Sequence, residues 1–317
     1  MRNHVVTLVL LSACTADSDL SQIESNSVVA NGQNLNGQNL NGQNLNGQNL
    51  NGQNLNGPDN GSFTIWTSLL GVKLNGKQFN ASLASTVFTG NDGSTTVTGT
   101  GFAQAEFQGM RGDGRTVRMR IRSVVAPPAG STTWRYFVEY REDNQSWYPV
   151  CANASGPIAA IPVNGIWDHR QGVAGGGGHV ASSDKFTFAC EGQGAIGKCI
   201  AMGYEPWSAQ GGVSLAGHHR SCIRMLRGDY CGDGTSYTQD GNRVNVYDGL
   251  GIQDDTEDWV IEAEWDVQGA RCFYPLNRSR AGIPCYDARV ALACGSPTNF
   301  GAGALLMNET PTAGLTP

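Results

Sequence analysis

Paired carboxylates are the residues of this sequence whose spacing best suits catalysis. Glu262 and Glu264 stand two positions apart in the segment EAEWD, and on a β-strand this spacing places both side chains on one face, about 6.5–7 Å apart. Two carboxylates at such a separation can serve as acid and nucleophile on a glycosidic bond. Asp229 is a third, weaker candidate for the same chemistry. The pair also suits a solvent-exposed sheet face, so a glycan hydrolase is the alternative hypothesis and not the leading one.

Other catalytic and metal-binding patterns are absent or incomplete in the sequence. It contains no Gly-x-Ser-x-Gly segment, which marks many serine hydrolases, and no His-Glu-x-x-His zinc motif. The segments from Asp233 to Asp240 and from Asp254 to Asp258 offer oxygen ligands for calcium, but they lack the spacing of an EF-hand. We therefore expect no cofactor or metal, with calcium as a weak alternative.

The nine cysteines divide into one N-terminal residue, Cys14, and eight in the rest of the chain. An even set in an exported protein predicts disulfide bonds, here four. Full pairing leaves no free thiol to act as a cysteine nucleophile. Proximity along the sequence predicts the pairs Cys190–Cys199, Cys222–Cys231 and Cys272–Cys285, which leaves Cys151 to pair with Cys294.

The N-terminus predicts export and lipid anchoring. A short positive segment with Arg2 precedes the apolar stretch Val5 to Leu11, and the run Leu-Ser-Ala-Cys then ends at Cys14. This order resembles the signal peptides of bacterial lipoproteins, and the apolar stretch is too short to span a membrane. We expect residues 1–13 to be removed and Cys14 to be acylated, with an ordinary signal peptide as the alternative. Thr15, where inner-membrane lipoproteins carry Asp, favours the outer membrane.

Residues 14–61 have the composition of a flexible tether. Five copies of Gly-Gln-Asn-Leu-Asn run from Gly32 to Asn56. The period resembles that of pentapeptide repeats, but five copies make little more than one coil, and solenoid coils need stacked neighbours to bury a core. A Gly-rich chain of this length spans roughly 25–30 Å, which would hold a domain away from a membrane surface. A self-associating Asn/Gln segment is the alternative.

The segment from His218 to Gly234, HHRSCIRMLRGDYCGDG, organises the middle of the chain. Its apolar residues fall at helical spacing, which predicts a short helix with Arg220, Arg224 and Arg227 on the face opposite the apolar stripe. The glycines that follow end this helix and form a turn around Asp233. A short helix joined to a turn by disulfides is the leading interpretation. The alternative is a site formed by His218, His219, Arg220, Asp229 and Tyr230.

This segment resembles a known family motif. The family is the ADYC domain, found in lipoproteins of myxobacteria and their relatives, and Gly228 replaces the alanine of its core. The similar residues are Arg227, Gly228, Asp229, Tyr230, Cys231, Gly232, Asp233 and Gly234. Flanking segments at 187–192, 197–207 and 262–272 extend the resemblance over roughly residues 117–294. The family has no established activity, so the resemblance implies an envelope lipoprotein and assigns no catalytic residue.

Alternating residues predict a sheet that supports this segment. Val117, Met119 and Ile121 alternate with arginines, and the segment from Trp134 to Tyr140 repeats the pattern one strand later. Ion pairs across this hairpin are the leading explanation for the arginines, and a face for anionic ligands is the alternative. The glycine-rich segment 172–179 lacks the Lys and Ser/Thr of a phosphate-binding loop, and we expect it to be a mobile loop.

Composition and element pattern together limit the class of protein. The net charge of −6 comes without basic runs, which argues against a nucleic-acid partner. We predict a β-rich α+β fold, with antiparallel sheet and short helices, cross-linked by disulfides and preceded by a disordered N-terminal tether. The expected parts are a signal peptide (1–13), the tether (14–61), an ADYC-type globular domain (62–296) with a β-rich portion at 62–150, and a flexible tail (297–317).

The leading functional prediction is a cell-envelope lipoprotein at the outer membrane. Its lipid would bind the membrane, and its tethered domain would act as a binding or structural module for a protein or glycan ligand. An enzyme is the less favoured prediction, with the glycan hydrolase built on the paired carboxylates as its specific form.

Overall fold

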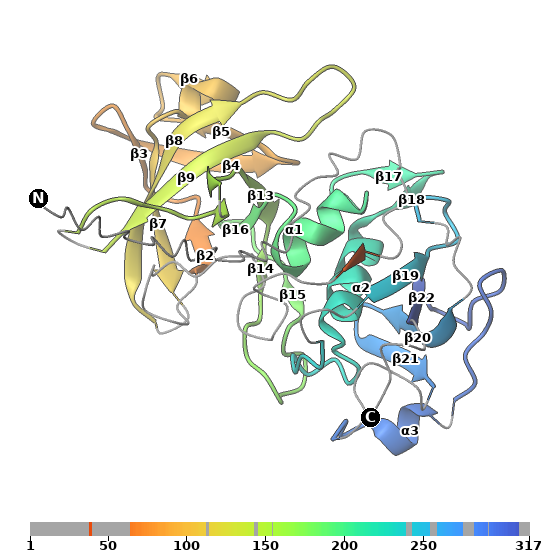
Figure 1. Ribbon diagram of the computed structural model, residues 1–317. Helices are drawn as coiled ribbons and strands as arrows, with labels where there is room; N and C mark the ends of the chain where they lie inside the picture. Colours follow the sequence, from red (N-terminus) through yellow and green to blue (C-terminus); the bar gives the residue numbers. More distant parts are fainter. Residues whose placement is uncertain are drawn as a thin grey trace, which may run out of the picture.

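The computed structural model describes residues 38–39, 64–111, 114–142, 145–153, 155–238, 243–253, 259–274, 282–290 and 292–310. It is rich in strands, with antiparallel sheets and a few short helices (Figure 1). The predicted β-rich α+β class is therefore confirmed. In the described residues, no helix has the length and apolar composition needed to cross a bilayer.

Six strands of the N-terminal half pair in a closed ring. Each neighbour in the ring is hydrogen-bonded to the next, so the sheet forms a barrel and has no free edge along these strands. In ring order the strands are β9 (Arg135–Arg141), β13 (Ala160–Asn164), β16 (Lys185–Cys190), β2 (Thr64–Ser68), β7 (Glu106–Arg111) and β8 (Thr116–Val125).

Short strands extend this barrel at its sides. One extension leaves β7 and ends beside a 3-10 turn, η1 (Gly99–Phe102), and β10 (Tyr148–Pro149) pairs with β9 on another side. The strands of the first extension are β3 (Val72–Leu74), β4 (Lys77–Ala84), β5 (Val87–Asn91) and β6 (Thr96–Thr98). Two further short strands, β11 (Ala152–Asn153) and β12 (Gly156–Pro157), form a small hairpin.

Aromatic side chains fill the barrel. Phe88 lies 5.1 Å from both Tyr136 and Phe186, measured between ring centroids, in edge-to-face contacts that are the favoured geometry for aromatic pairs. The predicted alternation along β8 is confirmed, because Val117, Met119 and Ile121 are buried inside. The barrel therefore has its own core.

The arginines that alternate with these residues form ion pairs with both neighbouring strands, whereas the prediction named only the hairpin with β9. Arg120 pairs with Glu139 of β9, and Arg118 pairs with Glu106 of β7. The pairs lie near the surface, where such interactions contribute little stability. They account for the arginine row without an anionic ligand.

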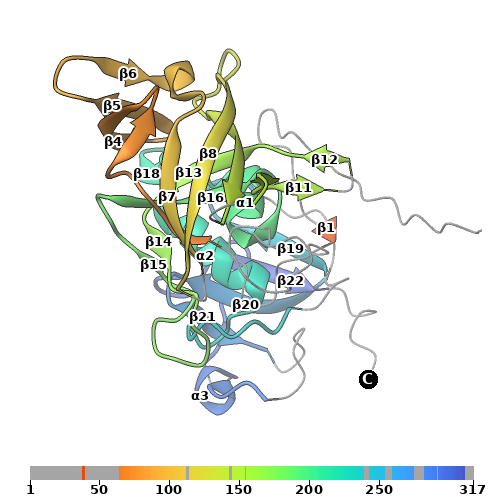
Figure 2. The same cartoon turned by 90° about the vertical axis from the view of Figure 1, so that its left-hand side faces the viewer.

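A second lobe contains the helices and a five-stranded antiparallel sheet, below the barrel in the view of Figure 2. The helices α1 (Gly194–Ala201) and α2 (Ala216–Arg227) pack on each other, and α2 covers the sheet. A short helix, α3 (Tyr286–Val290), packs on β21 (Gly269–Phe273). In sheet order the strands are β1 (Gln38–Asn39), β19 (Arg243–Tyr247), β22 (Leu306–Thr310), β20 (Val260–Asp266) and β21 (Gly269–Phe273).

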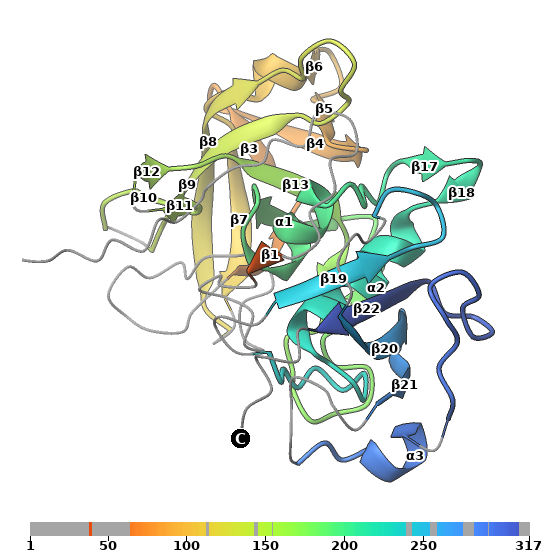
Figure 3. The same ribbon diagram turned by 45° about the vertical axis from the view of Figure 1, so that its right-hand side comes forward.

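Two of these strands change the predicted organisation. β22 is buried along its length between β19 and β20, so the expected flexible tail at 297–317 is wrong for residues 306–310. β1 places two residues of the Gly-Gln-Asn-Leu-Asn repeats beside β19, as Figure 3 shows. The barrel strands also continue to Cys190, past the predicted limit of the β-rich part at residue 150.

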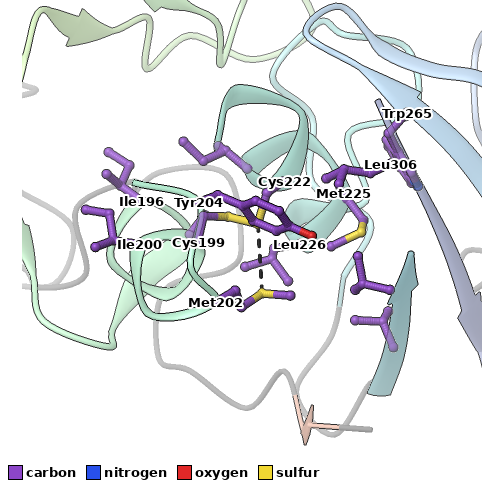
Figure 4. Packing of buried hydrophobic residues seen from close by; sticks show 14 of the residues in the cluster. Ile196, Cys199, Ile200, Met202, Tyr204, Cys222, Met225, Leu226, Trp265 and Leu306 are labelled. Atoms are coloured by element: carbon purple, nitrogen blue, oxygen red, sulfur yellow. Dashed lines mark hydrogen bonds between the residues drawn. A yellow bond between two sulfur atoms is a disulfide. The ribbon is translucent and has the colours of Figure 1, made fainter. Parts of the chain in front are cut away.

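The four disulfides are present, but their partners differ from the predicted ones. The pairs are Cys151–Cys190, Cys199–Cys222, Cys231–Cys285 and Cys272–Cys294. All four predicted pairings are wrong, both the three based on sequence proximity and the remaining Cys151–Cys294. Cys199 of α1 pairs with Cys222 of α2, and both lie in the core of the second lobe beside Met202 and Tyr204 (Figure 4). The disulfides join elements that pack together, and proximity in sequence does not reveal that packing.

Candidate functional site

The ADYC-like motif forms a buried ion cluster at the end of α2. Asp229 accepts hydrogen bonds from Nη1 of Arg224 and from the backbone N–H groups of Asp233 and Gly234. Arg227 lies 3.8 Å from the same carboxylate and donates to the carbonyl of Gly234. Helix α2 ends here because Gly228 adopts a left-handed conformation with φ +62°. The motif therefore closes the helix and ties it to the following turn.

Both arginines of the cluster are buried, with side-chain exposures of 4% for Arg224 and 1% for Arg227. Helical spacing placed both arginines on the face opposite the apolar stripe, and the fold buries them there as well. Burial raises the pKa of Asp229, while the two guanidiniums oppose that rise. Burial lowers the pKa of Arg227 to about 10. The charges are stable in this position because each has a partner of opposite sign.

The glycine-rich segment packs directly on this cluster. The carbonyl of Gly176 accepts a hydrogen bond from Arg224, and the N–H of Gly177 donates to Asp168 O at 2.6 Å. A Cβ atom on Gly177 would stand 2.4 Å from Nη1 of Arg227, so only glycine fits there. The expectation of a mobile loop is not met, since the segment is hydrogen-bonded. Gly176, Gly177 and Gly178 allow this close packing, because a Cβ atom at any of them would stand under 3.0 Å from a neighbouring atom.

Glu262 lies in a second buried network, which continues from Tyr230. It accepts hydrogen bonds from the hydroxyl of Tyr230 and from the side-chain amide of Asn308. Asn308 accepts in turn from Nε1 of Trp265 at 2.7 Å. With an exposure of 0%, Glu262 does not lie on a solvated sheet face.

Glu264 is also buried, at 2% exposure, and holds a loop in place. Its Oε1 accepts from the backbone N–H groups of Gly295 at 3.1 Å and Gly301 at 2.8 Å. Glu264, Cys272 and Cys294 form the one cluster with metal-like spacing in the described residues, but the two cysteines are joined in a disulfide and are not thiolate ligands. The hydrogen bonds to the backbone of this loop explain why the carboxylate of Glu264 is buried.

A cavity of about 130 Å³ lies where the barrel meets helix α2. Its walls come from the barrel side, from the hairpin of β14 (Ile166–Trp167) and β15 (His179–Val180), from α2, and from the segment before the hairpin of β17 (Ala209–Gln210) and β18 (Val213–Ser214). The lining residues are Ser85, Val163, Asn164, Trp167, His179, Pro206, Trp207, Ala216, His219 and Arg220.

Helical spacing explains which residues of α2 reach the cavity. Ala216, His219 and Arg220 follow the i, i+3, i+4 pattern of one helix face. The indole of Trp167 meets the rings of His179 and His219 edge-on, with centroids 4.8 and 6.0 Å apart. None of the lining residues is acidic. The arrangement can bind a ligand, but it offers no carboxylate pair for hydrolysis.

Both histidines of the cavity are neutral at physiological pH. Burial lowers the pKa of His179, and it lowers the pKa of His219 to about 3. Nε2 of His179 lies 2.9 Å from the carbonyl of Asn164, and Nε2 of His219 lies 3.3 Å from that of Ile196. A carbonyl oxygen only accepts, so each Nε2 carries the proton and each Nδ1 remains an acceptor.

Comparison with known proteins identifies the family. The model of the ADYC domain matches residues 99–279, more than half of the chain. This chain belongs to the ADYC domain family. No curated protein and no solved structure matches it.

Within the ADYC domain, the predicted five-residue site does not come together as one site. Asp229 and Tyr230 are buried in the two networks, whereas His219 and Arg220 line the cavity. His218 instead stacks near Tyr204, with ring centroids 6.2 Å apart. The described contacts of Asp229 and Tyr230 hold the end of α2 to the following turn and to β20.

Sequence reasoning named some cavity residues but missed their neighbours. His179 lies forty positions before His219, and nothing local in the sequence links them. Trp207 directly follows Pro206 in the sequence, and its place at the cavity follows only from the packing of the lobes.

Other candidates from the sequence lie partly outside the described residues. The lipidation candidate Cys14 is among them, as are 239–242 and 254–258, which include most of the calcium candidates. Asp233 is described, and its Oδ1 accepts from the N–H of Thr235 at 2.9 Å.

Proposed function

We propose that this chain is an exported lipoprotein that presents a disulfide-bonded binding domain at the cell envelope, anchored in the outer membrane through Cys14. The observation that carries the proposal is the pairing of all eight cysteines other than Cys14 in four disulfides. Such extensive pairing is typical of proteins that fold in an oxidising compartment. It leaves one cysteine, in the sequence context of a lipoprotein signal, for the lipid.

Binding is favoured over hydrolysis by the positions of the carboxylates. Glu262 and Glu264 are buried and occupied by hydrogen bonds, and neither lines the cavity. General acid and base catalysis requires a carboxylate within reach of the substrate. The cavity, by contrast, combines aromatic walls with a few polar groups, as small-molecule binding sites do.

Metabolic labelling with an alkyne fatty acid tests the lipid anchor. In a Gram-negative bacterial host, the wild-type chain is expected to incorporate the label and to partition into detergent, and Cys14→Ser is expected to do neither. Thr15→Asp is the matched control, because it keeps the cysteine and should change only the membrane in which the labelled protein is found. Label retained by Cys14→Ser would refute the anchor.

A further inference from the structure

Among the residues that the structure describes, Arg220 has no anionic partner. It lines the cavity, it is half-buried, and no carboxylate of the described residues lies within ion-pair distance of it. Other arginines of this lobe differ, since Arg224 pairs with Asp229 and Arg271 with Asp266. A guanidinium in a partly enclosed site pairs well with a carboxylate, through two parallel hydrogen bonds.

The remaining polar groups of the cavity suit hydroxyl groups. Nδ1 of His179 and of His219 is an acceptor, because each Nε2 donates to a backbone carbonyl. The indole N–H of Trp207 is buried and has no hydrogen-bond partner among the described residues. A buried donor without a partner is unfavourable, so a ligand oxygen that came within reach of this N–H would gain a hydrogen bond. Ser85 and Asn164 add a hydroxyl and an amide to the same wall.

The volume of the cavity limits the size of the ligand. At about 130 Å³ it is close to the roughly 150 Å³ of an apolar cavity that holds one benzene molecule. One six-membered ring therefore fits, with further groups extending through the opening. The indoles of Trp167 and Trp207 supply apolar wall for the ring, and the polar groups favour a ring with several hydroxyls over a plain aromatic one.

We propose that this cavity binds the carboxylate-bearing ring of an acidic sugar, with Arg220 on the carboxylate and with Trp207, His179 and His219 on the hydroxyls. The proposal rests on the binding role proposed above and not on the lipid anchor. Uronic acids combine the required features, namely one ring, one carboxylate and several hydroxyls. The site could thereby recognise an acidic glycan at a terminal residue.

Saturation-transfer NMR on the full chain in detergent micelles tests this inference with four probes. Glucuronate is the expected ligand, and glucose is its neutral match. Benzoate represents an aromatic carboxylate, and inorganic phosphate an anion without a ring. Glucuronate is expected to bind at least tenfold more tightly than the other three.

Variants locate the binding. Arg220→Gln is expected to weaken glucuronate at least tenfold, and Trp207→Phe, which keeps a ring but removes the N–H, is expected to weaken it several-fold. Arg271→Gln is the matched control, because this arginine is exposed, pairs with Asp266 and does not line the cavity. Circular dichroism checks that each variant keeps the fold.

Several outcomes would overturn the proposal. Equal affinity for glucose would remove the role of Arg220, and tighter binding of benzoate or phosphate would assign the cavity to an aromatic acid or to a simple anion. Unchanged glucuronate binding in folded Arg220→Gln would place the ligand elsewhere. No binding of any probe, together with normal acylation of Cys14, would refute the sugar site and leave the lipid anchor intact.

Discussion

Removing the charge of Asp229 should destabilise the second lobe strongly. The carboxylate has 0% exposure and faces Arg224 and Arg227, which are almost as buried. Asp229→Asn would keep the size of the side chain, but it would remove the one carboxylate that faces both buried guanidiniums. Breaking a buried ion pair in this way costs about 3–5 kcal/mol. Asn also offers one acceptor oxygen where Asp229 uses two, on Arg224 and on two backbone N–H groups.

This loss is large relative to the stability of an ordinary domain. Folded proteins are stable by about 5–15 kcal/mol in total, so the variant would be marginal. For a protein of this size, a loss of about 4 kcal/mol lowers the melting temperature by roughly 8–16 °C. The effect concerns stability, because the carboxylate is closed off from solvent and from the cavity.

Urea denaturation with the disulfides intact, followed by tryptophan fluorescence, measures the effect. Glu106→Gln is the matched control, since Glu106 pairs with Arg118 at the barrel surface, where the side chains are 27% and 48% exposed. Such a pair is worth about 0–1 kcal/mol. A double variant with Arg224→Gln should lose less than the sum of its two single changes, because the second change relieves an unpaired charge. If Asp229→Asn loses no more than Glu106→Gln, the buried cluster does not stabilise the fold as argued.

Three further predictions concern the rest of the fold. Gly232→Ala would place Cβ 1.7 Å from the carbonyl oxygen of Gln268, at a residue with φ +71°. We expect it to lower the free energy of unfolding in urea by at least about 2 kcal/mol, and Gly249→Ala, with φ +65° but open space, to lower it by only about 1–2 kcal/mol. Equal losses would contradict the close approach at Gly232. Burial lowers the pKa of His219 from 6.5 to about 3, so between these pH values the unfolded chain binds a proton that the folded chain does not. The free energy of unfolding should therefore fall by about 2–3 kcal/mol through this residue from pH 7 to 4.5. His219→Gln should lose that part of the pH dependence, and an unchanged slope would refute the role of His219. Replacing Cys199 and Cys222 together by alanine should lower the free energy of unfolding by about 3 kcal/mol, because the disulfide no longer closes its loop in the unfolded chain. Alkylation of the mature wild-type chain without reductant should label none of the eight domain cysteines. Labelling of two or more would refute the pairing.

The helix of the motif illustrates what neighbouring residues determine. The spacing of Cys222, Ile223 and Leu226 predicted helix α2, and Gly228 predicted its end, because both depend on residues within a few positions. The strand at Val117–Ile121 followed in the same way from its period of two. The even number of cysteines outside Cys14 likewise indicated full pairing without any knowledge of the fold.

Partner choice between distant segments was decided only by the tertiary structure. Cys199 pairs with Cys222 because α1 packs on α2, and Arg224 is buried because the loop at Gly176 and the turn at Val267 lie against it. Helical spacing alone placed Arg224 opposite the apolar stripe, and it cannot show which distant segment of the chain packs against that side.

The candidate site shows the same division. The residue types that suit binding, histidine, arginine and tryptophan, were visible in the sequence, but the cavity that gathers His179, Trp207 and Arg220 forms where the barrel meets α2. Local periodicity is set by the geometry of one helix or strand. A site between two lobes depends on how the lobes pack together, and that packing is stabilised by many weak contacts spread over the whole chain.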